Sequence, residues 1–401
     1  MGFNAVRLQF IWEAFEPEPG VYDDSYLARM VEVAEACGAR GLYVVVDIHQ
    51  DGFSRFSSRG CGAGFPAWAV SPRARVEAPD NGCDCKDWVV RLVTDPNFFK
   101  SARDFYADVC GVRTRFLAMV GRAAGGFASC PAVVGYDLLN EPWADEVGEL
   151  ALLHEDEATA IRSAHPAAIL FVAGHAATDS GFQTRLPRPR FGNFAYAPHY
   201  YMPLAMALGG WCGSTGPIDR AFANMEGKAA EWGVPLFVGE YGIKAGAGRG
   251  GDYVAAVLDD LDAVLGSGAQ WTYTPHWTPE RRDGWNMEDF SIVDDGLRPR
   301  ANYRPRPCPR KVAGEPSLFR YQQPGPPGCP PARMEFAWDA VAGLGATEVF
   351  VPSAVFPAGS TLEVSPGGIE CTRDEARQLL LVRVPGDGPA RVALTAPPDP
   401  P

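Results

Sequence analysis

The alternation of strand-like and helix-like segments over the first 300 residues is the feature that most constrains the fold of this chain. Short runs rich in Val, Ile, Leu and Phe predict strands, and the longer segments between them have apolar residues at helical spacing. Such alternation is typical of an α/β fold, in which helices cover a parallel sheet. Seven predicted strands are one fewer than a (β/α)8 TIM barrel contains, so we expect such a barrel with its first β/α unit missing. The predicted strands are residues 4–10, 41–49, 133–140, 169–173, 194–199, 236–240 and 270–274, and the predicted helices are 26–37, 105–124, 146–164, 218–232 and 253–265.

The pattern changes after the last predicted strand. Ten prolines fall between residues 299 and 331, and because proline removes backbone donors and stiffens the chain, this stretch predicts a linker or a wrapping loop. Short β-type runs separated by Gly and Pro turns then predict a small antiparallel β-sandwich. We therefore expect two domains, an N-terminally incomplete catalytic barrel over 1–310 and a sandwich over 311–401. The β-type runs are 333–338, 347–351, 361–365, 378–384 and 390–394.

Charge, hydropathy and cysteine spacing exclude several classes of protein. A net charge of −13 argues against a nucleic-acid partner, and no apolar run is long enough to cross a bilayer. The chain opens inside a predicted strand and shows no signal region, so we expect a misplaced or trimmed start. The ten cysteines form no paired CxxC sets with zinc spacing. Loop cysteines such as Cys85 and Cys308 fit either reduced thiols or disulfides of a secreted or lumenal protein, and we favour the secreted or lumenal location.

Polar side chains follow nearly every predicted strand of the first domain. In a barrel of parallel strands, the carboxyl ends of the strands meet at one face, where catalytic residues lie. A single polar residue at a strand end is ordinary, whereas an ordered set around one rim predicts an active site. The set comprises Arg7 within the first strand, followed at later strand ends by Asp47, His49, Asp51, Asn140, Glu141, His199, Tyr201, Glu240 and Trp271.

Two carboxylates stand out because the strands that precede them are otherwise apolar. Glu141 follows the run from Val133, and Glu240 follows the run from Leu236. Glycoside hydrolysis requires two carboxyl groups that flank the scissile bond, at a separation of about 5–5.5 Å in enzymes that retain the anomeric configuration. Taken singly, each Glu could instead cap a helix or form a salt bridge at the rim. The ordered set of strand ends favours the catalytic interpretation.

Several motifs resemble glycoside hydrolase family 5, a family of retaining (β/α)8 glycosidases. Two stretches, Asn140-Glu141-Pro142 and the strand 237–242, are similar to that family's two signatures. Further stretches are similar to its endoglycoceramidase branch and to the related enzymes that act on sterol and ceramide glucosides. The resemblance covers most of residues 1–300, and members of this branch carry a C-terminal β-sandwich. The stretches similar to the branch are 47–51 with Ser54-Arg55, 62–69, 271–274 and 284–291.

The resemblance implies a role for each residue of the set. Glu141 would be the acid/base, and Glu240 would be the nucleophile, kept ionised by Arg7 and oriented by Tyr201. No cofactor is required by this chemistry, because both proton transfer and covalent capture use carboxylates. The Asp-x-His-x-Asp spacing at 47–51 could alternatively hold a metal ion. Sugar binding is the preferred interpretation, so we expect no metal at this motif. The other implied contacts are Asn140 with the sugar 2-hydroxyl, His199 with Glu141, Asp47, His49 and Asp51 with sugar hydroxyls, Trp271 beneath the sugar ring, and Trp285 and Asn286 in the same subsite.

The expected function is hydrolysis of a β-glycosidic bond between a sugar or oligosaccharide and a lipid aglycone, by double displacement. One alternative is a β-glucosidase for steryl or other simple β-glucosides, and another is a noncatalytic carbohydrate- or lipid-binding protein. We expect a monomer whose partners are its glycolipid or β-glucoside substrate and a peripheral membrane surface. Apolar loop residues could hold the lipid or cover the core, namely Phe53, Phe56, Phe65, Trp68, Met202, Leu204, Met206, Leu208 and Trp211.

Overall fold

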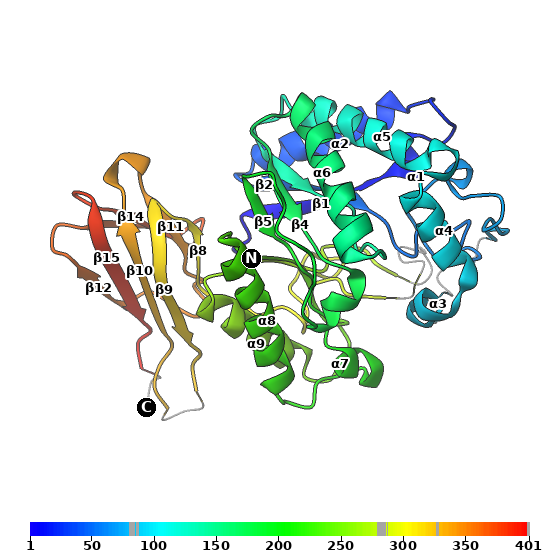
Figure 1. Ribbon diagram of the computed structural model, residues 1–401. Coiled ribbons are helices and arrows are strands. Elements are labelled where there is room, and N and C mark those ends of the chain that lie inside the picture. Colours follow the sequence, from blue (N-terminus) through cyan, green and yellow to red (C-terminus); the bar gives the residue numbers. More distant parts are fainter. Residues whose placement is uncertain (80–84, 86–87, 279–285, 287, 326–328, 399–401) are drawn as a thin grey trace. The chain divides into compact units, whose positions relative to one another are not determined.

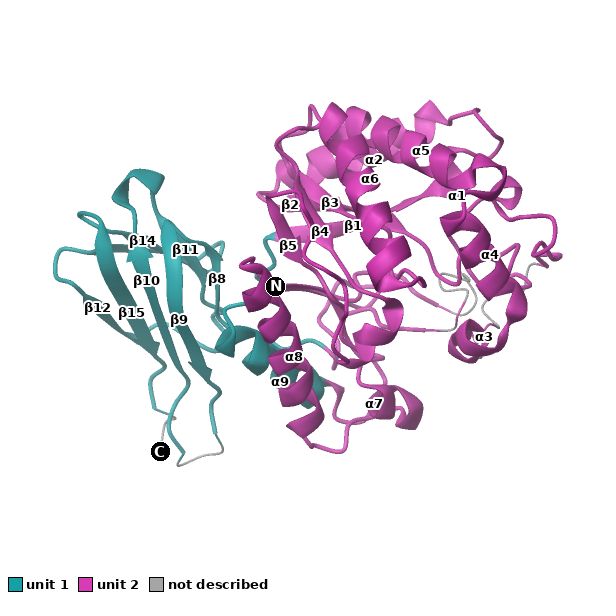
Figure 2. Cartoon of the chain, in the orientation of Figure 1, with its two compact units in different colours: residues 1–4, 251–267, 303–401 teal, residues 5–250, 268–302 magenta. Residues whose placement is uncertain are grey.

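The computed structural model describes residues 1–401 except 80–84, 86–87, 279–285, 287, 326–328 and 399–401 (Figure 1). The chain divides into two compact units (Figure 2). The barrel unit consists of residues 5–250 and 268–302, and the sandwich unit consists of residues 1–4, 251–267 and 303–401. Our boundary at residue 310 was drawn on composition alone and stays a prediction.

The barrel unit is built on parallel strands that follow one another in chain order. The first five form one sheet, β6 is joined to β7, and isolated parallel bridges connect Tyr196 to Leu236 and Tyr200 to Tyr241. This arrangement confirms the predicted parallel α/β architecture. Within the described residues, β1 and β7 are not paired with each other. The strands are β1 (Ala5–Ile11), β2 (Tyr43–His49), β3 (Val133–Asp137), β4 (Ile169–Val172), β5 (Phe194–Tyr196), β6 (Phe237–Tyr241) and β7 (Ser267–Gln270).

Strand β2 lies between β1 and β3, and its buried β-branched residues suit this central position. Residues 44–49 of this strand are all buried, as is typical of a parallel strand with both faces covered. The register places Arg7 of β1 beside Val45 of β2, and Asp47 of β2 beside Asp137 of β3. The sheet thus brings three charged residues from three strands to neighbouring positions.

Helices occupy the connections between the strands (Figure 1). The Asp23 carboxylate caps α2 by accepting from the backbone N–H groups of Ser25 and Tyr26. The single helix predicted over 105–124 is wrong: α4 ends at Tyr106 and α5 begins at Val112, because Asp108 and Cys110 have positive φ values of 51° and 59°. The helices are α1 (Trp12–Phe15), α2 (Asp24–Gly38), α3 (Trp88–Thr94), α4 (Pro96–Tyr106), α5 (Val112–Phe127), α6 (Ala151–Ala164), α7 (Pro203–Leu208), α8 (Gly216–Trp232) and α9 (Gly250–Ala263).

The sandwich unit contains two antiparallel four-stranded sheets, in the orders β12-β15-β10-β9 and β13-β14-β11-β8. Side chains such as Phe336, Trp338, Val349 and Val392 fill the core of this unit. The predicted antiparallel sandwich is confirmed. The strands are β8 (Cys308–Lys311), β9 (Gly314–Gln322), β10 (Arg333–Ala340), β11 (Thr347–Phe350), β12 (Thr361–Ser365), β13 (Glu370–Asp374), β14 (Leu379–Arg383) and β15 (Gly388–Thr395).

The proline-rich stretch, which the sequence predicts to be a linker or a wrapping loop, also contains strands. It contains β8 and β9, each with a proline inside the strand, Pro309 and Pro316. Both strands stand at the end of their sheet order, where one side of the backbone has no ladder partner. A proline is tolerated at such an edge because its missing N–H removes no ladder bond that a central strand needs.

A disulfide between Cys61 and Cys85 ties together the long connection that follows β2. The sequence leaves the loop cysteines open between thiols and disulfides, and this pair is a disulfide. None of the helices in the described ranges is both long enough and apolar enough to span a membrane.

Candidate active site

Arg7 lies at the centre of a buried polar cluster at the carboxyl ends of the barrel strands. Its guanidinium donates from Nε to Asp137 at 2.7 Å, from Nη1 to Glu240 at 2.6 Å and from Nη2 to Asn140 at 2.7 Å. Nη1 also lies 2.9 Å from Asp47. Although burial opposes its charge, the surrounding carboxylates raise the pKa of Arg7, so the guanidinium stays protonated. One cation on β1 therefore joins residues from three other strands, β2, β3 and β6.

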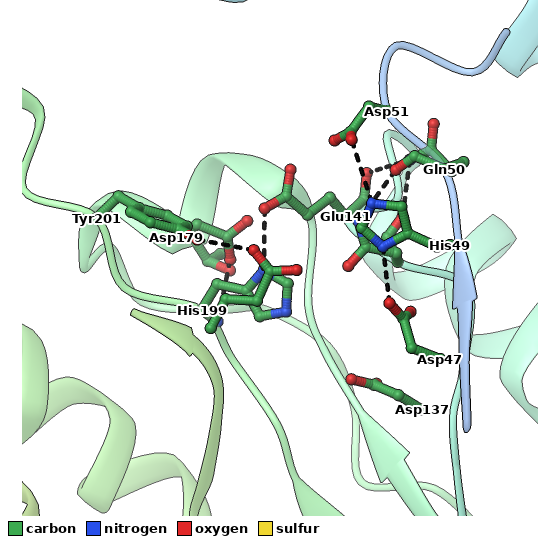
Figure 3. A network of polar contacts seen from close by, with 12 residues as sticks. Asp47, His49, Gln50, Asp51, Asp137, Glu141, Asp179, His199 and Tyr201 are labelled. Atoms are coloured by element: carbon green, nitrogen blue, oxygen red, sulfur yellow. Dashed lines mark hydrogen bonds and ion pairs between the residues drawn. The ribbon is translucent and has the colours of Figure 1, made fainter. Parts of the chain in front are cut away.

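His49 bridges two of the predicted sugar-binding carboxylates (Figure 3). Its Nδ1 lies 2.7 Å from Asp47 and its Nε2 lies 3.2 Å from Asp51. Burial opposes protonation, but the two carboxylates raise the pKa of His49 well above its ordinary value, which favours an imidazolium. Asp47 is fully buried, whereas the Asp51 side chain is 17% exposed. This geometry favours Asp51 for direct sugar contact and Asp47 for holding Arg7 and His49.

Gln50 fixes the turn that presents Asn140 and Glu141 (Figure 3). Its side-chain amide donates to the carbonyl of Asn140 at 2.7 Å and to that of Glu141 at 2.9 Å. Asn140 donates back to the carbonyl of Gln50 at 3.0 Å. Glu141 has φ 43°, in the left-handed region that non-glycine residues rarely adopt. The amide of Gln50 stabilises this backbone shape, which aims the Glu141 side chain into the cluster.

His199 contacts both of the predicted catalytic carboxylates. Its Nδ1 lies 2.9 Å from Glu141 Oε1 and 3.8 Å from Glu240 Oε2. These two carboxyl oxygens are therefore no farther apart than the sum of those distances. This limit, 6.7 Å between the two oxygens, admits the carboxyl separation of retaining glycosidases, about 5–5.5 Å, and leaves out most of the range of about 6.5–9.5 Å found in inverting ones.

Glycines in β6 and directly after it allow the ring and backbone contacts around Glu240. A Cβ on Gly239 would lie 2.9 Å from the His199 ring, and a Cβ on Gly242 would lie 2.5 Å from the carbonyl oxygen of Trp271. Tyr201 donates its hydroxyl to Glu240 Oε2 at 2.8 Å. Glu240 is thus held by Arg7 on one oxygen and by Tyr201 on the other.

Aromatic and amide side chains from the segment after β7 complete the site. The ring of Trp271 is nearly parallel to that of His49, with centroids 5.8 Å apart, and it immediately follows β7 rather than lying within the strand. Asn286 donates to Glu288 Oε2 at 3.0 Å, and Trp88 donates to Glu288 Oε1 at 3.3 Å. Trp285, predicted for the same subsite, lies outside the described residues.

The two catalytic candidates differ in their electrostatic surroundings. Burial, followed by the charge of Asp51, raises the pKa of Glu141 to about 7. Burial also raises the pKa of Glu240, but the charges of His199 and Arg7 oppose that shift. Burial lowers the pKa of His199. A protonated Glu141 beside a Glu240 in contact with a guanidinium is the pairing that an acid and a nucleophile require.

Two groups of side chains have the spacing that a metal ion accepts. The ligand atoms of Asp47, His49 and Glu240 lie within 4.8 Å of one another, and so do those of Glu141, Asp179 and His199. In the first group, Arg7 already supplies a positive charge in contact with two carboxylates. In the second group, burial raises the pKa of both carboxyl groups, which favours protons there over a metal. The sugar-binding interpretation therefore stands as our proposal.

Sequence reasoning missed three residues of this cluster: Gln50, Asp137 and Asp179. Asp137 had a detectable signal, because it is a lone acid in the apolar strand β3. Gln50 lies inside the 47–51 motif but attracted no role. Asp179 lies in a short 3-10 helix (Ala176–Ser180), which is too short for a periodicity to mark it.

The apolar loop residues separate into two groups. Phe53, Phe65, Met202 and Trp211 are buried, and Phe53 stacks on Phe65 with centroids 3.9 Å apart. These residues cover core. On α7, by contrast, Leu204 and Leu208 are 51% and 68% exposed, so only part of the set is available to a ligand.

Two protein-family models match this chain. The model described as cellulase (glycosyl hydrolase family 5) matches residues 1–277, and the glycoside hydrolase family 5 C-terminal domain matches residues 306–394. Endoglycoceramidase I of Rhodococcus hoagii is 24% identical over 99% of this chain and 78% of its own length. Ergosteryl-beta-glucosidase of Saccharomyces cerevisiae is 41% identical over 18% of this chain and 9% of its own length.

Solved structures of endo-glycoceramidase II from Rhodococcus sp. are similar over nearly the whole chain. Its lactosyl-enzyme intermediate has a TM-score of 0.77 at 26% identity, and its ganglioside GM3 complex has a TM-score of 0.78 at 25% identity. Each match covers 98% of this chain and 89% of the other.

Proposed function

Because this chain belongs to glycosyl hydrolase family 5, we propose that it is a retaining β-glycosidase that cleaves a sugar or oligosaccharide from a lipid aglycone. The observation that carries the proposal is the pair Glu141 and Glu240, both within reach of one nitrogen of His199. The chain is therefore a glycoside hydrolase, and the noncatalytic alternative has no support in this geometry.

The geometry supports a double displacement. A carboxylate oxygen of Glu240 attacks the anomeric carbon, while Glu141 transfers its proton to the departing aglycone oxygen. Water then attacks the anomeric carbon of the glycosyl-enzyme, the bond from that carbon to the Glu240 oxygen breaks, and Glu141 accepts a proton from that water. Arg7 and Tyr201 hold Glu240 in place during both steps. We propose that the monomer is the active form.

The lipid aglycone is inferred from the relatives. Endo-glycoceramidase II is known in a ganglioside complex and as a lactosyl-enzyme, and both match nearly the whole chain. A second candidate is a β-glucosidase for steryl glucosides, favoured by the short segment shared with the yeast ergosteryl enzyme. The two candidates share the mechanism and differ in the size of the sugar released.

A substrate panel distinguishes these candidates. The panel contains an aryl β-glucoside, glucosylceramide, a ganglioside-type oligosaccharyl ceramide and a steryl glucoside, with released sugars identified by mass spectrometry. We expect the intact oligosaccharide from the ganglioside, because the relatives matched over most of the chain are endoglycoceramidases. Glucose from the steryl glucoside, with no release from the ganglioside, would favour the second candidate. No release from any member would overturn both.

We also propose that a lipid surface contacts α3 and α7. Val89, Val90 and Val93 of α3 and Leu204 and Leu208 of α7 are each more than half exposed. The two helices follow β2 and β5, at the carboxyl ends of the strands where the site lies, and both lie at the lower side of the barrel unit in Figure 1. Exposed aliphatic side chains gain about 1.5–3 kcal/mol each when they are fully buried in an apolar environment.

The triple variant Val89→Ser, Val93→Ser and Leu208→Ser is expected to have a kcat/KM on vesicle-borne glycolipid that is lower by about tenfold or more. The reason is that these three side chains no longer gain free energy from burial in the apolar part of the bilayer. Activity on a soluble aryl β-glycoside should not change. Leu152→Ser is the matched control, because Leu152 is equally exposed on α6 but lies outside both helices. Equal losses on both substrates, or no loss on vesicles, would contradict the membrane contact.

A further inference from the structure

Asp179 contacts the backbone of both residues that hold the catalytic carboxylates. It lies in a short 3-10 helix (Ala176–Ser180) that follows β4. Its Oδ1 accepts from the N–H of His199 at 3.3 Å, and its backbone carbonyl accepts from the N–H of Tyr201 at 2.9 Å. His199 in turn contacts Glu141 (Figure 3), and Tyr201 contacts Glu240.

The carboxyl group of Asp179 also lies close to the acid/base. One of its oxygens, a carboxyl oxygen of Glu141 and a ring nitrogen of His199 are all within 4.8 Å of one another. Among the described residues, no Lys or Arg forms an ion pair with Asp179. Two carboxyl groups this close do not readily ionise together, because the second charge repels the first.

The order in which this pair ionises follows from its surroundings. Burial, followed by the charge of Glu141, raises the pKa of Asp179 well above its ordinary value, whereas the pKa of Glu141 rises to about 7. Because no Lys or Arg of the described residues pairs with Asp179 to stabilise its charge, we expect Glu141 to lose its proton before Asp179 does. The groups that act on Asp179 are the charges of Glu141, Glu240 and Arg7 and the N–H of His199, and Asp179 in turn raises the pKa of Tyr196.

We propose that Asp179 is a positioning residue that works as a neutral carboxylic acid, holding His199 and Tyr201 in place while leaving Glu141 as the only member of the pair that changes charge. This proposal rests on the proposed function. It goes beyond it by assigning a fixed proton to a residue outside the two catalytic glutamates.

The reaction explains why a neutral neighbour is needed. In the first step the O–H bond of Glu141 breaks as a new O–H bond forms on the aglycone oxygen, and the electron pair of the broken glycosidic bond goes to that oxygen. Glu141 becomes a carboxylate and regains a proton from water in the second step. An ionised Asp179 would oppose this new charge, whereas a neutral one accommodates it, and its own proton is never transferred.

The test compares Asp179→Asn with Asp179→Leu on phenyl β-glucoside, whose leaving group needs a proton. Asn is neutral and keeps an oxygen that accepts from the N–H of His199. We therefore expect kcat/KM within about threefold of wild type, and the loss of activity at high pH should occur at the same pH as in wild type (an unchanged alkaline limb of the pH profile). Leu removes the acceptor, so kcat should fall about 10- to 100-fold with KM little changed, because His199 is misplaced by a fraction of an ångström. The alkaline limb should also shift by half a pH unit or more.

Two outcomes would overturn the proposal. If Asn lowers kcat as much as Leu does, the carboxylate is needed in its charged form. If Leu leaves kcat and the alkaline limb unchanged, Asp179 does not act through His199. If thermal melting shows that the Leu variant does not fold, Asp179→Ser replaces it in the comparison. Asp156→Asn is the control, because it neutralises an exposed acid. This test uses an aryl glucoside, whereas the proposed function is tested on glycolipids. Failure of the proposed function would leave the glycolipids uncleaved, and failure of the Asp179 proposal would be seen in the variants on the aryl glucoside.

Discussion

Replacing Glu240 with Gly is expected to lower kcat/KM by on the order of 10⁴- to 10⁶-fold, because no glycosyl-enzyme can form without the nucleophile. The loss should affect aryl and lipid glycosides alike, since attack on the anomeric carbon is common to both. Steady-state hydrolysis of a dinitrophenyl β-glycoside and of glucosylceramide measures it.

Azide provides a second readout for the Glu240→Gly variant. The cavity left by the side chain lies where attack begins, so azide should restore turnover and yield a glycosyl azide of inverted configuration, identified by NMR. Glu335→Gln, which alters an ion pair with Arg391 in the sandwich unit, is the matched control and should keep full activity. Residual activity above a few per cent without azide would remove Glu240 from the role of nucleophile.

Replacing Glu141 with Ala is expected to have a substrate-dependent effect. Lipid glycosides have poor leaving groups, so their hydrolysis should fall by on the order of 10²- to 10⁴-fold without the general acid. A dinitrophenyl leaving group needs no proton, so its release should persist as a burst while the glycosyl-enzyme accumulates. Rapid-mixing absorbance measures the burst, and azide should give a product of retained configuration. Equal losses on both substrates would contradict the acid/base role.

The pH profile of the wild-type enzyme tests the same residue. Glu141 must begin each turnover protonated, and burial and Asp51 raise its pKa to about 7. Activity on lipid glycosides should therefore fall as the pH rises through that value, while protonation of Glu240 sets a separate loss at low pH. Glu141→Gln should remove this alkaline limb from whatever activity remains. A limb that persists in the Gln variant would belong to another group.

The sequence predicted the barrel strands because burial on both faces leaves long apolar runs, as in β2 and β3. Such runs also made the polar residues at their ends conspicuous, and these residues meet in one cluster around Arg7. Their catalytic roles stay proposals until the variants are measured.

The features that were missed had weaker local signals. Strand β13 is largely polar and lies at a sheet edge, so it has no apolar alternation to detect. Strands β8 and β9 contain proline, which ordinarily argues against a strand. Asp179 reaches the site through tertiary contacts with His199 and Tyr201, which spacing along the chain does not reveal.

The sharing of Arg7 among Asp47, Asp137, Asn140 and Glu240 has a consequence for how such enzymes diversify. Removing one partner of a buried ion pair costs about 3–5 kcal/mol, a large part of the roughly 5–15 kcal/mol that holds a typical domain folded. Stepwise mutational paths through this cluster therefore pass through unstable intermediates. Lineages can lose the cluster but cannot readily rebuild it, so new substrate preferences are expected to arise in the loops above the strands.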